Sequence, residues 1–243
     1  MERERQDLEE VNRVVRNRLL PWWDHVQVYI CQAAQENTWN HLPAAVLAVY
    51  HYLGHRRDLA IKMAAIFKMV YLASSIHEAV GDDEEGQVYD QHMQFTILIG
   101  DYISGCILKM LVESGADHLL DVFADAIAQI NEGMVMKHKL EVAPEQVISK
   151  TRASLYKAAF VCAARTSGVE TEGLFWYAKL GFHIGMALET QSLAGLHPDM
   201  VSTHSKKSQD LFYLINQKGL TSSTILELLI RDNMGRDLAR AVI

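Results

Sequence analysis

The sequence predicts an all-α protein that forms a single-domain bundle of about ten helices over residues 1–243. Two observations support this fold class. Apolar residues recur at spacings of three and four along nearly the whole chain, as in amphipathic helices. Runs in which apolar and polar residues alternate, as in β-strands, are scarce. The chain contains only 14 glycines and 4 prolines, and no linker-like segment divides it. Since 49% of the 243 residues are hydrophobic, the chain can bury one sizeable core.

The first helix is expected over residues 7–20, where an amphipathic pattern ends at Pro21. A second should begin near Pro43 and end near Gly54. Residues 57–80 and 91–115 are apolar over most of their circumference, which predicts two buried central helices.

Further helical patterns cover the rest of the chain, at residues 116–141, 144–168 and 170–195. Residues 196–204, "LHPDMVSTH", are the best candidate for a loop. A short helix is expected near the end of the chain, capped by Thr221 or Ser222.

Composition and charge exclude several classes of protein. The net charge of −7 disfavours a nucleic-acid partner, which usually requires a basic face. No uncharged apolar run reaches the ~18–20 residues of a membrane span, and the charged N-terminus does not resemble a signal peptide. The three cysteines, Cys31, Cys106 and Cys162, are widely separated and are predicted to be buried, reduced thiols. We therefore expect a cytoplasmic protein.

An acidic stretch follows the first central helix and is the main candidate for chemistry. Glu78 and Asp82 are four residues apart, so a continuous helix would place both carboxylates on one face, where they could bind Mg²⁺. Gly81 weakens a helix at this point, and residues 82–85 also fit the solvated end of a helix. Glu78 and Asp82 are therefore weak metal candidates.

Four segments in order resemble motifs of the trans-polyprenyl diphosphate synthase family: "IHEAVGD" (76–82), "LIGDY" (98–102), "INEG" (130–133) and "LGFHIGMALE" (180–189). The resemblance covers roughly residues 40–195 and implies an isoprenoid-synthase-like bundle around a central cavity. It places the following residues at family motif positions: His77, Glu78 and Asp82 in a vestigial first motif, Gly100, Asp101 and Tyr102 in the second, and Glu132 and Gly133 in the third.

The chain departs from this family where the chemistry would occur. The family's two aspartate-rich motifs bind Mg²⁺ ions that grip a substrate diphosphate. Here the first motif has Ala79 at its middle aspartate position, and Ser192 and Leu193 replace the aspartates of the second. The expected basic stretch before the first central helix contains only His41. Because of these departures from the family pattern, we expect no catalytic residue and no cofactor in this chain.

A chain that resembles this family but lacks its metal-binding aspartates is similar to the small, non-catalytic component I subunits of heptaprenyl diphosphate synthases. That resemblance implies a catalytic partner subunit, which would carry the Mg²⁺, and a role in setting product length for menaquinone side chains. It also implies pairing through a central helix. The candidate interface residues are Phe95, Ile99, Tyr102, Ile103 and Cys106. The same helix would also allow the isolated chain to form a homodimer.

Two alternatives remain open on the sequence. One is a weak stand-alone prenyltransferase that uses Glu78 and Asp82 with Mg²⁺, with Asp101 as an additional ligand. The other is an isoprenoid-binding protein that holds a prenyl lipid and catalyses no reaction.

Overall fold

The computed structural model describes residues 2–20, 22–80, 91–193 and 198–216. In this part of the chain all regular structure is helical, which confirms the predicted fold class. The α-helices are α1 (Glu2–Leu19), α2 (Trp23–Ala33), α3 (Thr38–Tyr52), α4 (Arg57–Glu78), α5 (Gln91–Glu113), α6 (Leu120–Lys139), α7 (Pro144–Thr151), α8 (Ala153–Thr166), α9 (Thr171–Glu189) and α10 (Pro198–Asn216).

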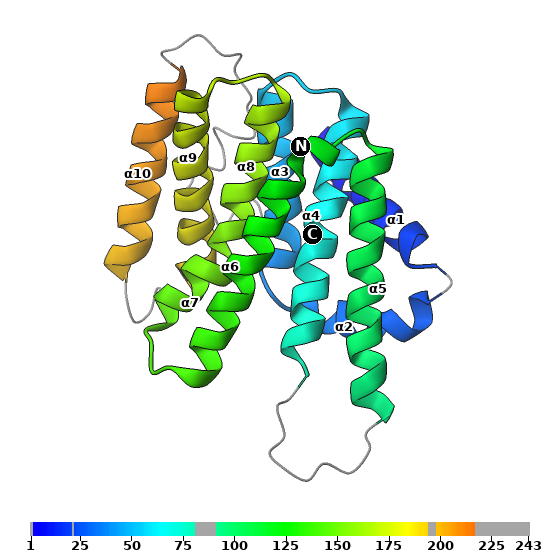
Figure 1. Cartoon of the computed structure of the whole chain (residues 1–243). Coiled ribbons are helices and arrows are strands. Elements are labelled where there is room, and N and C mark those ends of the chain that lie inside the picture. Colours follow the sequence, from blue (N-terminus) through cyan, green and yellow to red (C-terminus); the bar gives the residue numbers. More distant parts are fainter. Residues whose placement is uncertain (1, 21, 81–90, 194–197, 217–243) are drawn as a thin grey trace.

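Helix α4 is the centre of the bundle. It contacts α1, α2, α3, α5, α6 and α8, and most of its side chains are buried on every side. Figure 1 shows α5 on one side of α4 and α6 on the other, with α8, α9 and α10 following beyond α6 toward one edge. The apolar circumference of this segment therefore correctly predicted a central helix.

Two predicted helix ends coincide with glycines in the left-handed conformation. Gly54 and Gly168, both with φ of 73°, follow α3 and α8. After each glycine the chain turns back, and the next amide bonds to a carbonyl of the last helical turn, as His55 N does to Tyr50 O.

Three sequence predictions about these elements are wrong. Helix α2 was not predicted. Residues 198–204 are not a loop but the first part of α10: Pro198 occupies the first helical position, where its missing N–H costs nothing. Of the three cysteines only Cys162 is buried, whereas Cys106 is partly exposed and Cys31 is exposed. The predicted helix capped by Thr221 or Ser222 lies outside the described residues.

Helices α8 and α9 approach closely because α9 carries glycines at the contact. A Cβ on Gly181 would lie 2.6 Å from the carbonyl oxygen of Tyr156 and 2.9 Å from Phe160 Cβ. Since α-helices cannot separate at one point without losing neighbouring contacts, we expect a methyl group here to strain the core.

We therefore predict that Gly181→Ala lowers the free energy of unfolding by about 2 kcal/mol. Gly105→Ala on α5 is the matched control, because a Cβ there meets nothing within 4 Å. That variant should gain about 0.5–1 kcal/mol from its better helix propensity. Urea denaturation measures both, and equal effects would contradict the packing argument.

Candidate functional site

The first three residues of the first family motif, Ile76 to Glu78, lie in the last turn of α4, where Glu78 faces two cationic side chains. Its Oε1 accepts a hydrogen bond from Lys137 Nζ at 2.5 Å, and its Oε2 lies 3.9 Å from Arg152 Nη2. Lys137 comes from the end of α6, and Arg152 from the junction of α7 and α8. Each carboxylate oxygen of Glu78 therefore already faces a positive charge.

This pairing makes Glu78 a poor ligand for a divalent cation. A Mg²⁺ ion would have to displace Lys137 and would lie close to both cationic groups, which repel it. Among the described residues no group of three or more His, Cys, Asp or Glu side chains is placed to hold a metal. Asp82, the other weak metal candidate, lies outside the described residues.

The second motif meets the first through a glycine. A Cβ on Gly100 of α5 would lie 2.6 Å from His77 Nε2, so glycine lets the exposed imidazole rest against this helix. The same Nε2 is 3.7 Å from Asp101 Oδ1, a loose and exposed contact. In this chain the two motifs thus serve to pack α4 against α5.

Tyr102 points away from that contact, toward the C-terminal end of α1. Its hydroxyl lies 3.5 Å from the carbonyl oxygens of Arg18 and Leu20. It thus ties α5 to α1 and does not reach the other motif residues.

The third motif joins α6 to α7. A Cβ on Gly133 would lie 2.7 Å from both Lys150 Cβ and Thr151 Cγ2, so glycine is required for the helices to approach. The neighbouring Glu132 accepts a hydrogen bond from Lys150 Nζ at 2.8 Å. These two motif positions therefore have a structural explanation that requires no substrate.

A buried carboxyl group lies at the end of α9, at the last position of "LGFHIGMALE". Glu189 accepts hydrogen bonds of 2.5 Å from Thr38 Oγ1 and from Tyr156 Oη. Burial raises the pKa of Glu189, although both hydrogen bonds and the charge of Arg152 oppose the shift. Arg152 also lies over the ring of Tyr71, 4.7 Å from its centroid. Glu189 thus joins α3 and α8 to α9 through hydrogen bonds.

Sequence reasoning missed the two cations at this site. His41, the only basic candidate it offered, is buried, and burial lowers its pKa, so it is a neutral side chain. The cations come instead from Lys137 and Arg152, which are 59 and 74 residues beyond Glu78 and follow no local pattern. Only the packing of α6 and α8 on α4 brings them to the motif.

The predicted interface on α5 requires a correction. Ile99 and Ile103 face α4 and are buried in the core of the chain itself, while Phe95, Tyr102 and Cys106 are partly buried at its edge. The outward face of α5 carries different apolar residues: Ile97, Leu98, Leu108 and Val112. Two of the five predicted residues are therefore core residues, because apolar periodicity alone does not tell which of two apolar stripes faces the core.

Helix α6 also has an exposed apolar stripe. Leu120, Ile127 and Val135 are exposed at helical spacing, whereas Phe123, Ala126 and Ile130 face the core. In Figure 1, α5 and α6 flank the central helix α4. Each of the two helices therefore leaves an apolar stripe outside the core of the described chain.

Two helices in the described part of the chain are long and apolar enough to cross a membrane by composition. One is α4, whose most apolar window is 78% buried inside the bundle. The other is the segment Gln94–Glu113 of α5, whose window is only 39% buried. Burial accounts for the composition of α4, but the apolar surface of α5 has no partner within the described chain.

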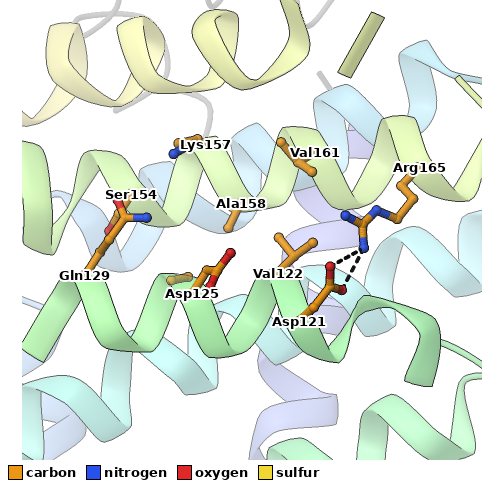
Figure 2. A pocket seen from close by; sticks show the side chains of 10 residues that line it. Asp121, Val122, Asp125, Gln129, Ser154, Lys157, Ala158, Val161 and Arg165 are labelled. Carbon is orange, nitrogen blue, oxygen red and sulfur yellow. Dashed lines mark hydrogen bonds and ion pairs between the residues drawn. The ribbon is translucent and has the colours of Figure 1, made fainter. Parts of the chain in front are cut away.

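A polar groove lies between α6 and α8. It is a cavity of about 140 Å³ lined by residues that include Asp121, Asp125, Gln129 and Lys157, with Arg165 bonded to both carboxylate oxygens of Asp121 at 2.6 and 2.7 Å (Figure 2). Ligand pockets usually have roughly 300–1,000 Å³. This groove is thus too small for a prenyl diphosphate.

The sequence and the fold were compared with those of known proteins. Residues 46–155 match the family model described as heptaprenyl diphosphate synthase (HEPPP synthase) subunit 1. The fold is that of the trans-prenyl diphosphate synthases. These findings confirm the resemblance recognised from the four motifs. No curated protein sequence matches the chain.

Similar solved structures share this isoprenoid synthase fold at low sequence identity. A geranyltranstransferase from Thermotoga maritima aligns with a TM-score of 0.71 and 16% identity, over 99% of this chain and 98% of its own. A mint deletion mutant of heterotetrameric geranyl pyrophosphate synthase gives 0.69 and 14%, over 97% and 100%. The geranyl diphosphate synthase small subunit from Antirrhinum majus gives 0.66 and 16%, over 95% and 97%.

Proposed function

We propose that this chain is the non-catalytic small subunit of a heteromeric long-chain polyprenyl diphosphate synthase. The observation that carries the proposal is the outward apolar face of α5, where Leu98 and Val112 are 64% and 63% exposed. An apolar face of this kind on a helix of a folded domain is typical of a protein–protein interface. The occupant we propose is the catalytic subunit, which packs against α5 and α6.

The ion pairs of Glu78 in the first motif support a subunit that does not catalyse prenyl transfer. Glu78 is neutralised by Lys137 and Arg152, so it is not free to hold a metal that would grip a diphosphate. Two of the similar solved structures are named as parts of heteromeric synthases, the heterotetrameric mint enzyme and the Antirrhinum majus small subunit. This agrees with the proposed pairing.

The finer assignments follow from the same proposal. The catalytic partner would hold the Mg²⁺ ions, the complex would work in the cytoplasm, and its product would be a heptaprenyl-type diphosphate for menaquinone side chains. The match of residues 46–155 to heptaprenyl diphosphate synthase subunit 1 supports this product length.

The test is reconstitution with a catalytic prenyl diphosphate synthase subunit from the same genome, chosen for its intact aspartate-rich motifs. With Mg²⁺, radiolabelled isopentenyl diphosphate and an allylic primer, we expect long-chain product only from the mixture. Chain length is read by thin-layer chromatography after dephosphorylation. If this chain changes neither rate nor product length, the proposal is wrong.

A stand-alone prenyltransferase that uses Glu78 is the second candidate, and one variant separates it from the first. We predict that Glu78→Gln lowers the free energy of unfolding by about 1–2 kcal/mol, since it removes the carboxylate that faces both the exposed Lys137 and the partly buried Arg152. The same variant should leave the rate of the reconstituted complex unchanged.

Glu132→Gln is the matched control, because it breaks a more exposed ion pair with Lys150 and should cost less than about 0.5 kcal/mol. Thermal melts and the reconstitution assay measure both. Mg²⁺-dependent turnover by the isolated chain that disappears in Glu78→Gln would favour the stand-alone enzyme instead.

A further inference from the structure

Exposed aromatic and aliphatic side chains gather at the corner between α1 and α2. Leu20 and Trp22, on the two sides of Pro21, are 52% and 42% exposed. The Trp22 ring meets the His25 ring edge-on, with centroids 5.9 Å apart, and the other side of His25 lies 5.7 Å from the Phe95 ring. Trp22 is thus held in place by a row of rings although much of it faces solvent.

This corner is continuous with the exposed face of α5. The His25–Phe95 contact and the Tyr102 hydroxyl near the Leu20 carbonyl join the two elements on either side of Leu98. Leu98 follows Phe95 by three residues and precedes Tyr102 by four, so all three lie along one side of the helix. A partner that covers Leu98 would therefore reach Trp22.

Two arginines near the corner already have contacts within the chain. Arg18 forms an ion pair with Glu113, and the guanidinium of Arg16 lies over the Trp23 ring, 5.3 Å from its centroid. A surface that binds anionic membranes usually offers free Lys and Arg beside its apolar residues. The nearby Asp24 is acidic and exposed. Because Arg18 is ion-paired and Arg16 is stacked on Trp23, the corner fits a protein surface better than an anionic membrane.

We propose that the Trp22 corner is a second anchor for the catalytic subunit, which extends the α5–α6 interface onto the N-terminal helices. The proposal rests on the proposed function, because it assigns the same occupant. A tryptophan held by neighbouring rings loses little conformational freedom on binding, and tryptophan is enriched among the residues that dominate interface affinity.

The experiment compares the affinity of wild-type chain and Trp22→Ala for the catalytic subunit, by isothermal titration calorimetry. We expect Trp22→Ala to weaken binding 10- to 100-fold. Trp22→Phe should retain most of the affinity. Phe175→Ala is the matched control: this aromatic residue is 51% exposed on α9, on the far side of the bundle from α1 and α2, and its loss should have no effect.

Each outcome decides the proposal. Circular dichroism melts check that Trp22→Ala is folded, and acrylamide quenching provides a second measurement. The emission of Trp22 is the difference between the wild-type spectrum and that of Trp22→Phe. Acrylamide should quench this emission in the free wild-type chain but not in the complex. Wild-type affinity of Trp22→Ala with no protection of Trp22 overturns this inference alone. A Trp22 effect confined to self-association, seen by sedimentation velocity, would make a second copy the occupant. If wild-type chain does not bind the catalytic subunit, the proposed function falls as well.

Discussion

Replacing Leu98 and Val112 together by aspartate should abolish binding of this chain to a catalytic prenyl diphosphate synthase subunit. Both side chains project from the outward face of α5, and a carboxylate in either position would be buried against an apolar partner without a counter-charge. We expect the dissociation constant to rise at least 100-fold, which corresponds to about 3 kcal/mol. Long-chain product in the reconstituted assay should disappear with it.

The same double variant should fold as well as the wild type, because neither side chain contributes to the core. Tyr213→Asp on α10 is the matched control: this apolar ring is 68% exposed and lies away from α5 and α6, so binding should be unaffected. Affinity can be measured by calorimetry and stability by thermal melts. Unchanged affinity in the double variant would show that the partner binds elsewhere or not at all.

The second large effect concerns the buried lysine of the central helix. Lys68 is only 2% exposed, donates a hydrogen bond of 2.8 Å to Asn12 Oδ1, and lies 4.0 Å from the centroid of the Trp39 ring. Burial lowers its pKa from 10.5 to about 7. No carboxylate is paired with this ammonium group among the described residues, so the buried charge destabilises the folded state.

The lowered pKa makes the effect of Lys68 depend on pH. Below pH 7 the lysine is protonated in the folded and unfolded chain, and the full cost of burying the charge is present. Between pH 7 and about pH 10.5 the unfolded chain binds more protons than the folded one, so this residue's contribution to stability rises with pH. The whole change amounts to about 3–5 kcal/mol.

We therefore predict that Lys68→Met is more stable than the wild type at pH 7, by about 1–3 kcal/mol after loss of the Asn12 and Trp39 contacts. The advantage should shrink or reverse as the pH approaches 10. Lys62→Met is the control, because Lys62 is an exposed lysine on the same helix and its replacement should be nearly neutral at every pH. Urea denaturation at several pH values measures the difference. If the difference in free energy of unfolding between Lys68→Met and the wild type stays constant with pH, this result would contradict the lowered pKa of Lys68.

The retained family motifs have a common physical explanation in this structure. Gly100 leaves space for the His77 ring, and Gly133 is required for α6 to approach Lys150 and Thr151. Glu132 and Glu78 are held in ion pairs with lysines of neighbouring segments. These residues therefore contribute to the fold without a metal or a substrate.

The sequence by itself determined the helical class, the central position of α4 and most helix ends. These properties depend on local periodicity, on proline and on left-handed glycines, which act over a few residues. It also predicted a scarcity of metal-binding carboxylates, since residue identity decides which ligands are available. It failed at α2 and at α10, where Pro198 begins a helix instead of a loop.

Only the tertiary structure decided which groups meet. Lys137 and Arg152 reach Glu78 from distant helices, Glu189 finds its donors on α3 and α8, and α5 turns Leu98 and Val112 outward while it buries Ile99 and Ile103. An apolar stripe on a helix indicates that this face is buried. It does not identify the helix or the partner protein that buries it. The burial of α5 depends on the neighbouring helices, and those contacts form between residues far apart in the chain.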